Sequence, residues 1–324
     1  MVPVLVSVYH RLYTFRRCIE ALQGNAEAAE TDLFIVSDAA GRPEDVPLVS
    51  KVRKYVGEIR GFKSVTLIAR PENWGANKSV MSAIKDLLDK FGRLIFLEDD
   101  ILSSRFFLDY MNKGLCLYAD DQNIFAICGY KSNFRLPAAM KSDVFTLPRY
   151  SPWGIGLWAD KYNAVDMSGA VDRYSLLRKD LPALFGFLER MDPSFLNILK
   201  GDSEGTIKAA DVRMDYYIMN KKMRCVYPCR TMTNVMQTGV DAMHSGLKWI
   251  PDERLANRAI TSISQIDDRF DDVIYERFLH AKYPSLLKRF CGSLVCNGIV
   301  DTLRYYGSRL FGLEFANRDR GFQE

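Results

Sequence analysis

Three consecutive carboxylates, Glu98, Asp99 and Asp100, directly follow the apolar run LIFL at residues 94–97. Adjacent negative charges at the end of a buried strand repel one another, and removing them from water costs free energy. A hard divalent cation, Mg²⁺ or Mn²⁺, would neutralise them and share its oxygen ligands with a diphosphate. The alternative is helix capping, in which Asp100 or Ser103 opens the next helix. Capping accounts for one acidic residue but not for three, so the segment favours metal or phosphate chemistry.

A second pair of carboxylates, Asp211 and Asp215, is spaced four residues apart in a segment with helical periodicity. Residues at this spacing share one helix face. A carboxylate there could act as a general base and take the proton from an attacking hydroxyl. The alternative is a solvated helix face, and that alternative is stronger for Asp211. No Ser-His-Asp or Cys-His set stands in a recognisable context, and the chain has only 3 histidines.

Two further segments carry residues that could contact a ligand. His244 stands in GVDAMHSG, a glycine-bounded loop that could offer an imidazole to a metal or a phosphate, although a loop histidine without a role is the alternative. Trp153 and Trp158 stand among glycines in SPWGIGLWADKY. Tryptophan faces stack on the apolar edges of sugar rings, and glycines let a saccharide approach the backbone. We expect one indole to pack in the core and favour Trp153 for the site.

The elements that must position these residues follow from hydrophobic periodicity. Up to residue 130, short apolar runs rich in β-branched residues alternate with helical patterns, which predicts a doubly wound α/β sheet. Strands of this kind are buried on both faces, and ligands bind at their carboxyl ends. The predicted strands are Val2–Val8, Leu33–Ser37, Val65–Ala69, Leu94–Leu97 and Asn123–Cys128. The predicted helices are Leu12–Leu22, Pro47–Ile59 and Ala76–Phe91.

The pattern loosens after residue 130, where prolines and glycines mark loops around an aromatic-rich segment. We expect two helices there, over Val171–Met191 and Ala209–Lys221. Lys200–Gly205 (KGDSEG) is predicted to be a polar surface loop. The chain has no internal repeat, and we expect one domain with a C-terminal elaboration.

Composition sets outer limits on the function. The 324 residues can bury a full core, and 48% apolar and 26% charged residues are ordinary for a soluble protein. A net charge of +4 excludes a strongly basic nucleic-acid binder. The 7 scattered cysteines indicate reduced thiols, and the chain shows neither a signal peptide nor the roughly 18 apolar residues of a membrane span. We therefore expect a cytoplasmic protein.

The order of several segments resembles bacterial sugar transferases of the glycosyltransferase-A fold, and more distantly the Golgi N-acetylglucosaminyltransferase that begins complex N-glycans. The segments are PVLVSVYHR at 3–11, IVSDAAG at 35–41, IARPENWG at 68–75, FLEDDIL at 96–102, SPWGIGLWADKY at 151–162, RMDYYIM at 213–219 and PCRTMTN at 228–234. The resemblance implies a Rossmann-like, mixed, mostly parallel sheet flanked by helices. It implies a transferase domain over 1–265, with a nucleotide-binding half (1–130) and an acceptor-side half (131–265), and a helical extension over 266–324.

The resemblance also implies roles at the nucleotide. Tyr9 and Arg11 would lie near the base or the phosphates, and Asp38 would contact the pyrimidine or the ribose, with turn capping as its alternative. The family usually carries Asn where this chain has His10, which puts that contact in doubt. Arg70, Asn73 and Gly75 would pass beside the nucleotide, with an ordinary strand-to-helix turn as the alternative.

In the acidic motif, the resemblance implies that Asp100 binds the metal, that Asp99 contacts the sugar nucleotide, and that Glu98 supports the metal site. It singles out Asp215, followed by an aromatic residue, as the general base. Met214 stands where family members often have Trp, so the acceptor-side wall is expected to differ. His244 is retained as a further candidate metal ligand.

The C-terminal segment 282–311 mixes apolar and aromatic residues with four cations, and it resembles a basic amphipathic helix that could lie on an anionic membrane. Packing on the main domain and dimerisation are equally open alternatives. Membrane contact would place the protein on the inner face of the plasma membrane.

The prediction is a metal-dependent, inverting hexosyl- or N-acetylhexosaminyl-transferase that uses Mn²⁺ or Mg²⁺. Its donor is expected to be a nucleoside-diphosphate sugar, with UDP or dTDP favoured, and its acceptor a saccharide or lipid-linked saccharide of bacterial surface polysaccharide assembly such as lipopolysaccharide. Nucleic acid is not expected as a partner. The alternatives are a sugar nucleotidyltransferase, which usually has a glycine-rich phosphate loop that residues 9–16 lack, and a catalytically silent sugar-binding module.

Overall fold

The computed structural model describes residues 1–180, 183–184, 187, 193–207, 209–236, 255–260, 263, 266, 268–282, 291, 294, 298–300, 302–303 and 306. Within these ranges every helix is too short or too polar to cross a bilayer. Six of the cysteines lie in them, and all six are free thiols.

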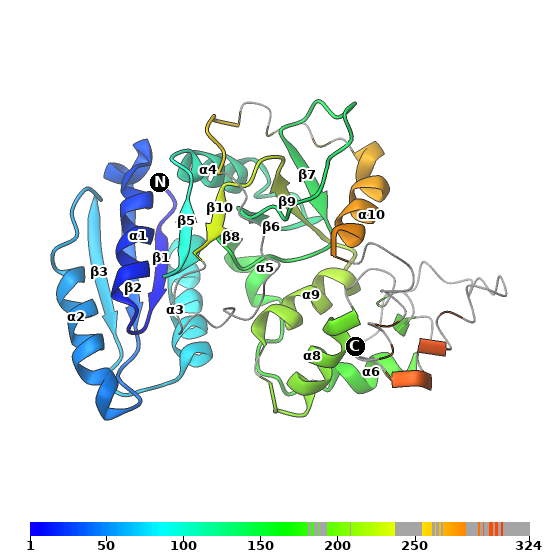
Figure 1. The fold of residues 1–324 in the computed structure, drawn as a ribbon, viewed down its shortest axis with the longest axis horizontal. Helices are drawn as coiled ribbons and strands as arrows, with labels where there is room; N and C mark the ends of the chain where they lie inside the picture. Colours follow the sequence, from blue (N-terminus) through cyan, green and yellow to red (C-terminus); the bar gives the residue numbers. More distant parts are fainter. Residues whose placement is uncertain are drawn as a thin grey trace.

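The described residues form an eight-stranded sheet in the order β3-β2-β1-β4-β8-β6-β9-β7 (Figure 1). The first four strands, which we call the parallel half, all run in one direction. In the other four, the mixed half, β8 is antiparallel to β4 and β6, and β9 is parallel to β6 but antiparallel to β7. Their bounds are β1 Val4–Val8, β2 Asp32–Ser37, β3 Ser64–Ala69, β4 Arg93–Glu98, β6 Ile124–Cys128, β7 Val144–Leu147, β8 Ile155–Trp158 and β9 Arg224–Pro228.

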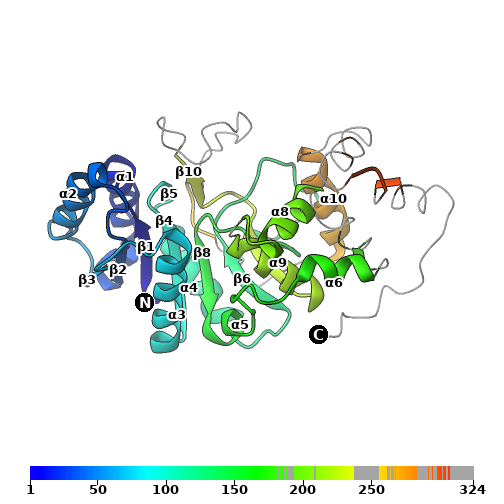
Figure 2. The ribbon, with the colours of Figure 1, turned by 90° about the horizontal axis from the view of Figure 1, so that it is seen from below.

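Helices cover both faces of the sheet because successive strand residues point to opposite sides. Val4 and Val6 join one core cluster with α1, α2 and α4, and Leu5 joins the other with α3, α9 and α10. Figure 2 shows α1 and α2 on one side of β1–β3 and α3 on the other. These helices are α1 Leu12–Gln23, α2 Val46–Val56, α3 Ala76–Phe91, α4 Phe107–Leu117, α9 Ala210–Asn220 and α10 Asp271–Lys282. The predicted α/β class, with a mixed, mostly parallel sheet between helices, is confirmed.

A small antiparallel sheet joins the two halves next to the acidic segment. It consists of β5 (Ile101–Ser103), which begins directly after Asp100, and β10 (Thr233–Val235). The backbone of Met236 donates to the carbonyl of Asp100 at 2.8 Å. A segment 130 residues away in sequence therefore fixes the backbone of the acidic motif.

Most of the predicted elements of the first 130 residues are confirmed to within a few residues, with one correction in β3. This strand is not buried on both faces, since it stands at the edge of the sheet and most of its residues are only partly covered. The helix-capping alternative for the acidic motif is also wrong. The next helix, α4, begins at Phe107, and no side chain caps it.

Two predictions for the second half of the chain need correction as well. The helix expected over Val171–Met191 is interrupted, because α6 (Arg173–Lys179) ends before Asp180, and the described residues beyond it, 183, 184 and 187, are helical again. Residues 200–203 are not a surface loop, since they end α8 (Pro193–Ser203), and only Glu204 and Gly205 form an exposed turn. Asp202 is buried there and pairs with Arg213 of α9, with Nε and Oδ2 2.7 Å apart. One of the polar residues of this segment therefore belongs to a buried ion pair.

The helix predicted over Ala209–Lys221 is confirmed as α9. The predicted domain boundaries at residues 130 and 265 stay a prediction, and the eight-stranded sheet runs across the first of them without a break. The C-terminal segment 282–311 lies largely outside the described residues.

Candidate active site

The acidic motif lies at the carboxyl end of β4, where the parallel half presents the ends of its strands. Arg11, in the turn between β1 and α1, contacts both aspartates. Its Nη2 and Nε donate to the two carboxylate oxygens of Asp99, and its Nη1 donates to Oδ2 of Asp100 at 3.1 Å. The pairing arises because β1 and β4 are parallel neighbours, so their carboxyl ends lie side by side. The chain thus supplies a cation to its own acidic motif.

Arg11 does not satisfy the whole cluster. Oδ1 of Asp100 is buried and has no hydrogen-bond partner among the described residues. Burial raises the pKa of Glu98 to about 7, with the charges of Asp100 and Asp99 adding to the effect and that of Arg11 opposing it. Burial also raises the pKa of Asp99 to about 6, although Arg11 lowers it. The motif therefore holds more negative charge than one guanidinium neutralises, and it presents an unused acceptor.

A divalent cation fits this donor set. The unpartnered Oδ1 of Asp100 is the type of hard oxygen ligand that Mg²⁺ and Mn²⁺ prefer, and Asp99 and Glu98 stand beside it. Among the described residues, no three His, Cys, Asp or Glu side chains form a ready metal site by themselves. A cation would thus need ligands from a diphosphate as well. His244, predicted as a further ligand, lies outside the described residues.

Loops at the ends of β1 and β2 hold the predicted base-side residues. The hydroxyl of Tyr9 donates to Oδ2 of Asp45 at 2.9 Å and accepts the backbone N–H of Gly41 at 2.8 Å. Asp38 is buried, and its Oδ1 accepts the backbone N–H groups of Ala39 and Trp74, both at 3.0 Å. Asp38 therefore stabilises the turn by accepting these two N–H groups. This capping role is the alternative that the sequence left open beside a contact with the nucleotide.

The segment after β3 is tied to the same loops. Asn73 donates from Nδ2 to the carbonyl of Ala39 at 2.6 Å. Gly75 has φ +79, a conformation that glycine adopts without strain, and it directly precedes α3. The positive end of this 16-residue helix consequently lies at the carboxyl edge of the sheet. Asn73 and Gly75 therefore lie close to the end of β2, where the sequence predicts them.

Arg70 has a different environment from the one expected. It is buried, its Nη2 donates to the carbonyl of Ser79 at 2.8 Å, and its guanidinium lies 4.3 Å from the ring centroid of Trp74. These contacts anchor α3 to the end of β3. A direct contact between Arg70 and a nucleotide stays a prediction.

The α9 carboxylates lie in the mixed half. Asp215 is buried, with 1% of its surface exposed, so the solvated-face alternative is wrong for this residue. Its Oδ1 accepts the backbone N–H of Tyr150 at 2.5 Å. Burial raises the pKa of Asp215 to about 7, while the nearby positive charge of Arg149 lowers it and Asp211 raises it. A carboxylate with this pKa can accept a proton near neutral pH.

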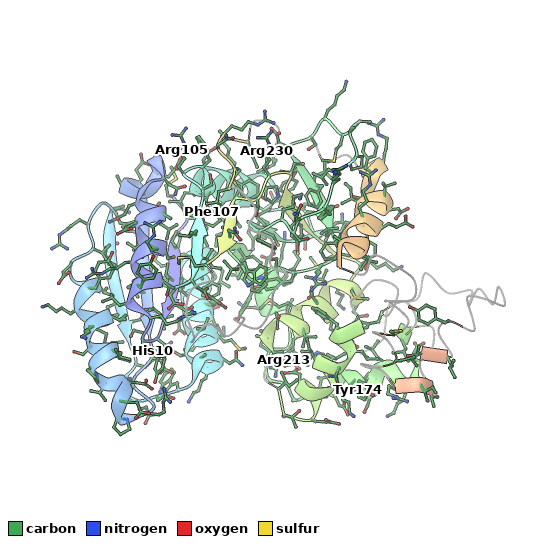
Figure 3. The ribbon with its side chains drawn as sticks, viewed as in Figure 1. His10, Arg105, Phe107, Tyr174, Arg213 and Arg230 are labelled. Carbon is green, nitrogen blue, oxygen red and sulfur yellow. The ribbon has the colours of Figure 1, made fainter. Side chains whose placement is uncertain are left out.

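Asp211 connects the two groups of acids. Burial raises the pKa of Asp211, and the charge of Asp211 in turn raises the pKa of Glu98. Asp211 and the acidic motif are thus coupled through their charges. Figure 3 labels one residue of each region, His10 directly after β1 and Arg213 on α9.

The two tryptophans differ as expected. Trp158 is buried, and its indole N–H donates to the carbonyl of Leu115 at 3.1 Å, so it is a core residue. Trp153 is only partly buried. Its carbonyl accepts the hydroxyl of Thr233 in β10 at 2.6 Å, and its ring packs edge-on against Tyr130. Because β10 pairs with β5, Trp153 is held one strand away from the acidic motif.

Sequence reasoning missed two residues of this region, Arg149 and Trp74. Arg149 is half-buried, and its guanidinium lies 4.5 Å from the ring centroid of Phe195. The indole nitrogen of Trp74 is buried without a hydrogen-bond partner among the described residues, and so is Nδ1 of His10. A signal for Arg149 existed in the sequence PRYSPW, where an arginine stands among prolines and aromatic residues ahead of the glycine segment.

Comparisons with known proteins show only distant similarity. No family model matches the chain, and no curated protein matches its sequence. Mannosyltransferase PcManGT from Pyrobaculum calidifontis, in complex with GDP-Man and Mn²⁺, is 14% identical over 96% of this chain and 80% of its own, with a TM-score of 0.43. S. aureus TarS 1–349, in complex with UDP-GlcNAc, is 13% identical over 97% of this chain and 84% of its own, with a TM-score of 0.41.

Likenesses at this level decide neither the family nor the activity of the chain. The kinship with the Golgi enzyme stays a prediction. The function has to be inferred from the side chains of the site.

Proposed function

We propose that this chain is a metal-dependent, inverting glycosyltransferase that moves a sugar from a nucleoside-diphosphate donor to a hydroxyl of a saccharide acceptor. One observation carries the proposal. A cluster of carboxylates with an unpartnered, buried oxygen on Asp100 lies at the carboxyl end of β4, and the α9 carboxylates couple to it through Asp211. The first group fits a cation and a diphosphate, and the second fits a proton acceptor.

Asp100 would hold the cation, with Glu98 and His244 in support, and Asp99 would contact the sugar nucleotide. When bound, Mn²⁺ or Mg²⁺ would supply Lewis-acid and electrostatic stabilisation of the charge that develops on the leaving diphosphate. The pKa values of Glu98 and Asp99 are raised by burial, which fits carboxylates that lack a full set of positive partners. Arg11, which already reaches both aspartates, would provide a further positive group beside the phosphates.

Asp215 would be the general base. The acceptor oxygen forms a bond to the anomeric carbon, the bond from that carbon to the diphosphate oxygen breaks, and the proton of the hydroxyl passes to Asp215. The N–H of Tyr150 holds Oδ1, which leaves Oδ2 to take the proton. A single displacement of this kind inverts the anomeric centre. A pKa of about 7 suits the residue to give and take protons at neutral pH.

Donor specificity is assigned to the loops after β1, β2 and β3. Hydrogen bonds connect the segments that carry Tyr9, Asp38 and Asn73, Gly75 follows in the same loop, and the N-terminus of α3 adds a partial positive charge. A pyrimidine nucleotide, UDP or dTDP, is favoured because Asp38 is the type of acceptor that a pyrimidine N–H requires. Trp153 would stack on the transferred sugar or the acceptor.

The acceptor is proposed to be a saccharide or lipid-linked saccharide of bacterial surface polysaccharide assembly. Support for a lipid surface comes from three described residues of the C-terminal segment, since Ile299, Val300 and Leu303 expose 64%, 54% and 54% of their surface. Flotation of the full chain with anionic vesicles tests peripheral binding. Loss of flotation in a chain truncated after residue 282 would support it, and flotation that persists in this truncated chain would contradict it.

The reaction is tested with a donor panel of UDP-, dTDP- and GDP-sugars in the presence and absence of Mn²⁺, with release of nucleoside diphosphate as the readout. We expect release from one class of donor, dependent on the metal and accelerated by saccharide acceptors. Asp211→Asn is the matched partner of Asp215→Asn, because both residues share one face of α9. A greater loss in Asp211→Asn would move the role of base to Asp211. Release from no donor, or release that does not depend on the metal, would refute the proposed function.

A further inference from the structure

Arg11 is paired with the same carboxylates that the proposed function needs for its ligands. Its guanidinium contacts both oxygens of Asp99 and one oxygen of Asp100. Those are the carboxylates that the proposed function assigns to the cation and the donor. A divalent cation bound to the free Oδ1 of Asp100 would lie beside this guanidinium, so the two positive charges would repel each other and compete for Oδ2 of Asp100 and for the oxygens of Asp99.

The contact is well formed and partly shielded from water. The side chain of Arg11 is 24% exposed, and those of Asp99 and Asp100 are 6% and 11% exposed. A bidentate arginine–carboxylate pair is stronger than a contact with a lysine ammonium, because the planar fork matches the two oxygens. A cation that enters the site must therefore compete with a formed ion pair rather than with water.

The side chain of Arg11 also has a second position available to it. It is the residue directly before α1, and the hydroxyl of Thr14 in the first turn of that helix donates to its carbonyl. Its backbone is fixed while the long side chain projects from the end of β1. The same strand-end edge carries Tyr9 and the N-terminus of α3, the surroundings assigned above to the phosphates. Rotation of the side chain alone would move the positive charge from the carboxylates to a phosphate.

We propose that Arg11 is an internal counter-cation that neutralises Asp99 and Asp100 in the ligand-free enzyme and transfers to the donor diphosphate when the cation binds. The proposal rests on the proposed function for the identity of the second partner. It makes metal binding and nucleotide binding interdependent: the cation alone has to displace Arg11, whereas the cation with a diphosphate gives Arg11 a new anionic partner. The apparent affinity for the metal alone is reduced by the fraction of molecules in which Arg11 occupies the carboxylates.

The test is a pair of binding measurements on the full chain, using Mn²⁺ alone and UDP in saturating Mn²⁺. Arg11→Met removes the competing charge and keeps much of the side-chain volume. We expect this variant to bind Mn²⁺ alone on the order of tenfold more tightly than the wild type, as seen by electron paramagnetic resonance of the free ion. It should bind UDP on the order of tenfold more weakly by calorimetry, because the phosphate contact is lost. The two affinities move in opposite directions.

Two further variants separate this exchange from a general disturbance. Arg11→Lys keeps a charge without the bidentate fork, and we expect both affinities to fall between those of the wild type and Arg11→Met. Arg17→Met removes an exposed cation from the same helix, one that pairs with Glu20, and should leave both affinities unchanged. Far-ultraviolet circular dichroism establishes that each variant is folded, and Arg11→Lys serves in place of Arg11→Met where the latter is not.

Equal or weaker Mn²⁺ binding in Arg11→Met would overturn the proposal, and so would Mn²⁺ binding to neither protein. Failure of the proposed function is a separate result. If the wild type releases diphosphate from no sugar nucleotide but Arg11→Met still binds Mn²⁺ more tightly, the competition at the carboxylates stands and the reaction assigned to the site does not.

Discussion

The two groups of carboxylates in this protein are neutralised in different ways. At the end of β4, Asp99 and Asp100 form direct ion pairs with Arg11 at a site that retains access to water. On α9, Asp215 accepts a hydrogen bond from the backbone N–H of Tyr150, and among the described residues its nearby cation, Arg149, stacks on Phe195 and forms no ion pair. The acids at the end of β4 have a positive partner, Arg11, that a ligand can replace. Asp215 instead has a positive charge, Arg149, that does not pair with it directly.

This difference matches the two kinds of chemistry that a sugar transfer needs. A site that must accept a cation benefits from carboxylates kept ionised by a replaceable partner. A base must change its protonation state during turnover, which a direct ion pair with arginine would oppose by holding the pKa low. With burial raising it and Arg149 lowering it, the pKa of Asp215 comes to about 7. We therefore expect substitutions at the end of β4 and substitutions on α9 to affect the protein in different ways.

Removal of Asp100 should have the largest effect. Asp100→Ala deletes the buried oxygen that lacks a partner and one of the two acids that Arg11 contacts. We expect metal-dependent donor hydrolysis and transfer to fall by a factor on the order of 10³ or more, since the charge on the leaving group loses its stabilisation. The circular dichroism spectrum should be unchanged. Wild-type rates in this variant, or in excess chelator, would contradict the assignment of the metal site.

Replacement of Asp215 should leave donor binding intact. For Asp215→Asn we expect transfer to fall by a factor on the order of 10² or more at saturating acceptor. In the wild type, kcat/KM should rise with pH up to about 7, because Asp215 must lose its proton to act as base. This dependence should disappear in the variant. Unchanged turnover, or a retained acid limb near pH 7, would remove Asp215 from the mechanism.

The same variant should be more stable than the wild type at neutral pH. Asp215 has a pKa of about 7 when folded, against about 3.9 in an unfolded chain. Between these values the folded state binds a proton that the unfolded state has lost, so the free energy of unfolding falls as pH rises. The stability difference between Asp215→Asn and the wild type should grow from pH 4 to 7, by an amount on the order of 4 kcal/mol, and level off above. Urea unfolding at several pH values measures it, and a difference that does not vary with pH would be inconsistent with the buried, raised pKa.

Removal of Arg149 should produce the smallest effect. The charge of Arg149 lowers the pKa of Asp215, so Arg149→Met should raise that pKa and shift the acid limb of kcat/KM to higher pH. We expect a several-fold loss at pH 7, on the order of 1 kcal/mol, that is recovered at pH 9. Arg149→Lys keeps the charge and should retain the wild-type profile. A uniform loss at every pH would indicate that Arg149 acts through packing on Phe195 and Phe278 alone.

The parallel half could be predicted from sequence because its elements are encoded locally. Continuous apolar runs define β1, β2 and β4, and the carboxyl ends of parallel strands meet at one edge, so the place of Glu98–Asp100 followed directly. The exception is β3, where an apolar run proved to be an edge strand. A run of apolar residues shows that a segment is suited to a strand, but strand order is set by tertiary packing.

The mixed half could not be predicted as well, because distant segments define it. Residues 200–205 look like a polar loop, yet Asp202 is a buried partner of Arg213 on another helix. The strands β7, β8 and β10 are four residues long or shorter and pair with segments far away in the chain. Gly154, between two predicted loops, has φ +80, and an added Cβ would lie 2.6 Å from a methyl carbon of Thr233. Its role in the approach of β10 is visible only in the folded chain.

The sequence indicated the acids of the candidate site, but it did not indicate the contacts that the cations of this region make. Asp100, Asp99 and Asp215 stand in motifs that their own charge makes conspicuous. Arg11 was expected near phosphate, and its ion pairs with the aspartates depend on the rotation of one side chain. Arg149 contacts Phe195 and Phe278 from two other helices, and no local pattern in the sequence encodes that arrangement.

A crystal structure with Mn²⁺ and UDP, phased so that anomalous scattering locates the metal, tests the central claim most directly. We predict one manganese site bound by Asp100 together with oxygens of the diphosphate, with Arg11 turned from the aspartates to a phosphate. A nucleotide bound elsewhere, with Arg11 still paired to Asp99 and Asp100, would contradict the assignment of this cluster as the donor site.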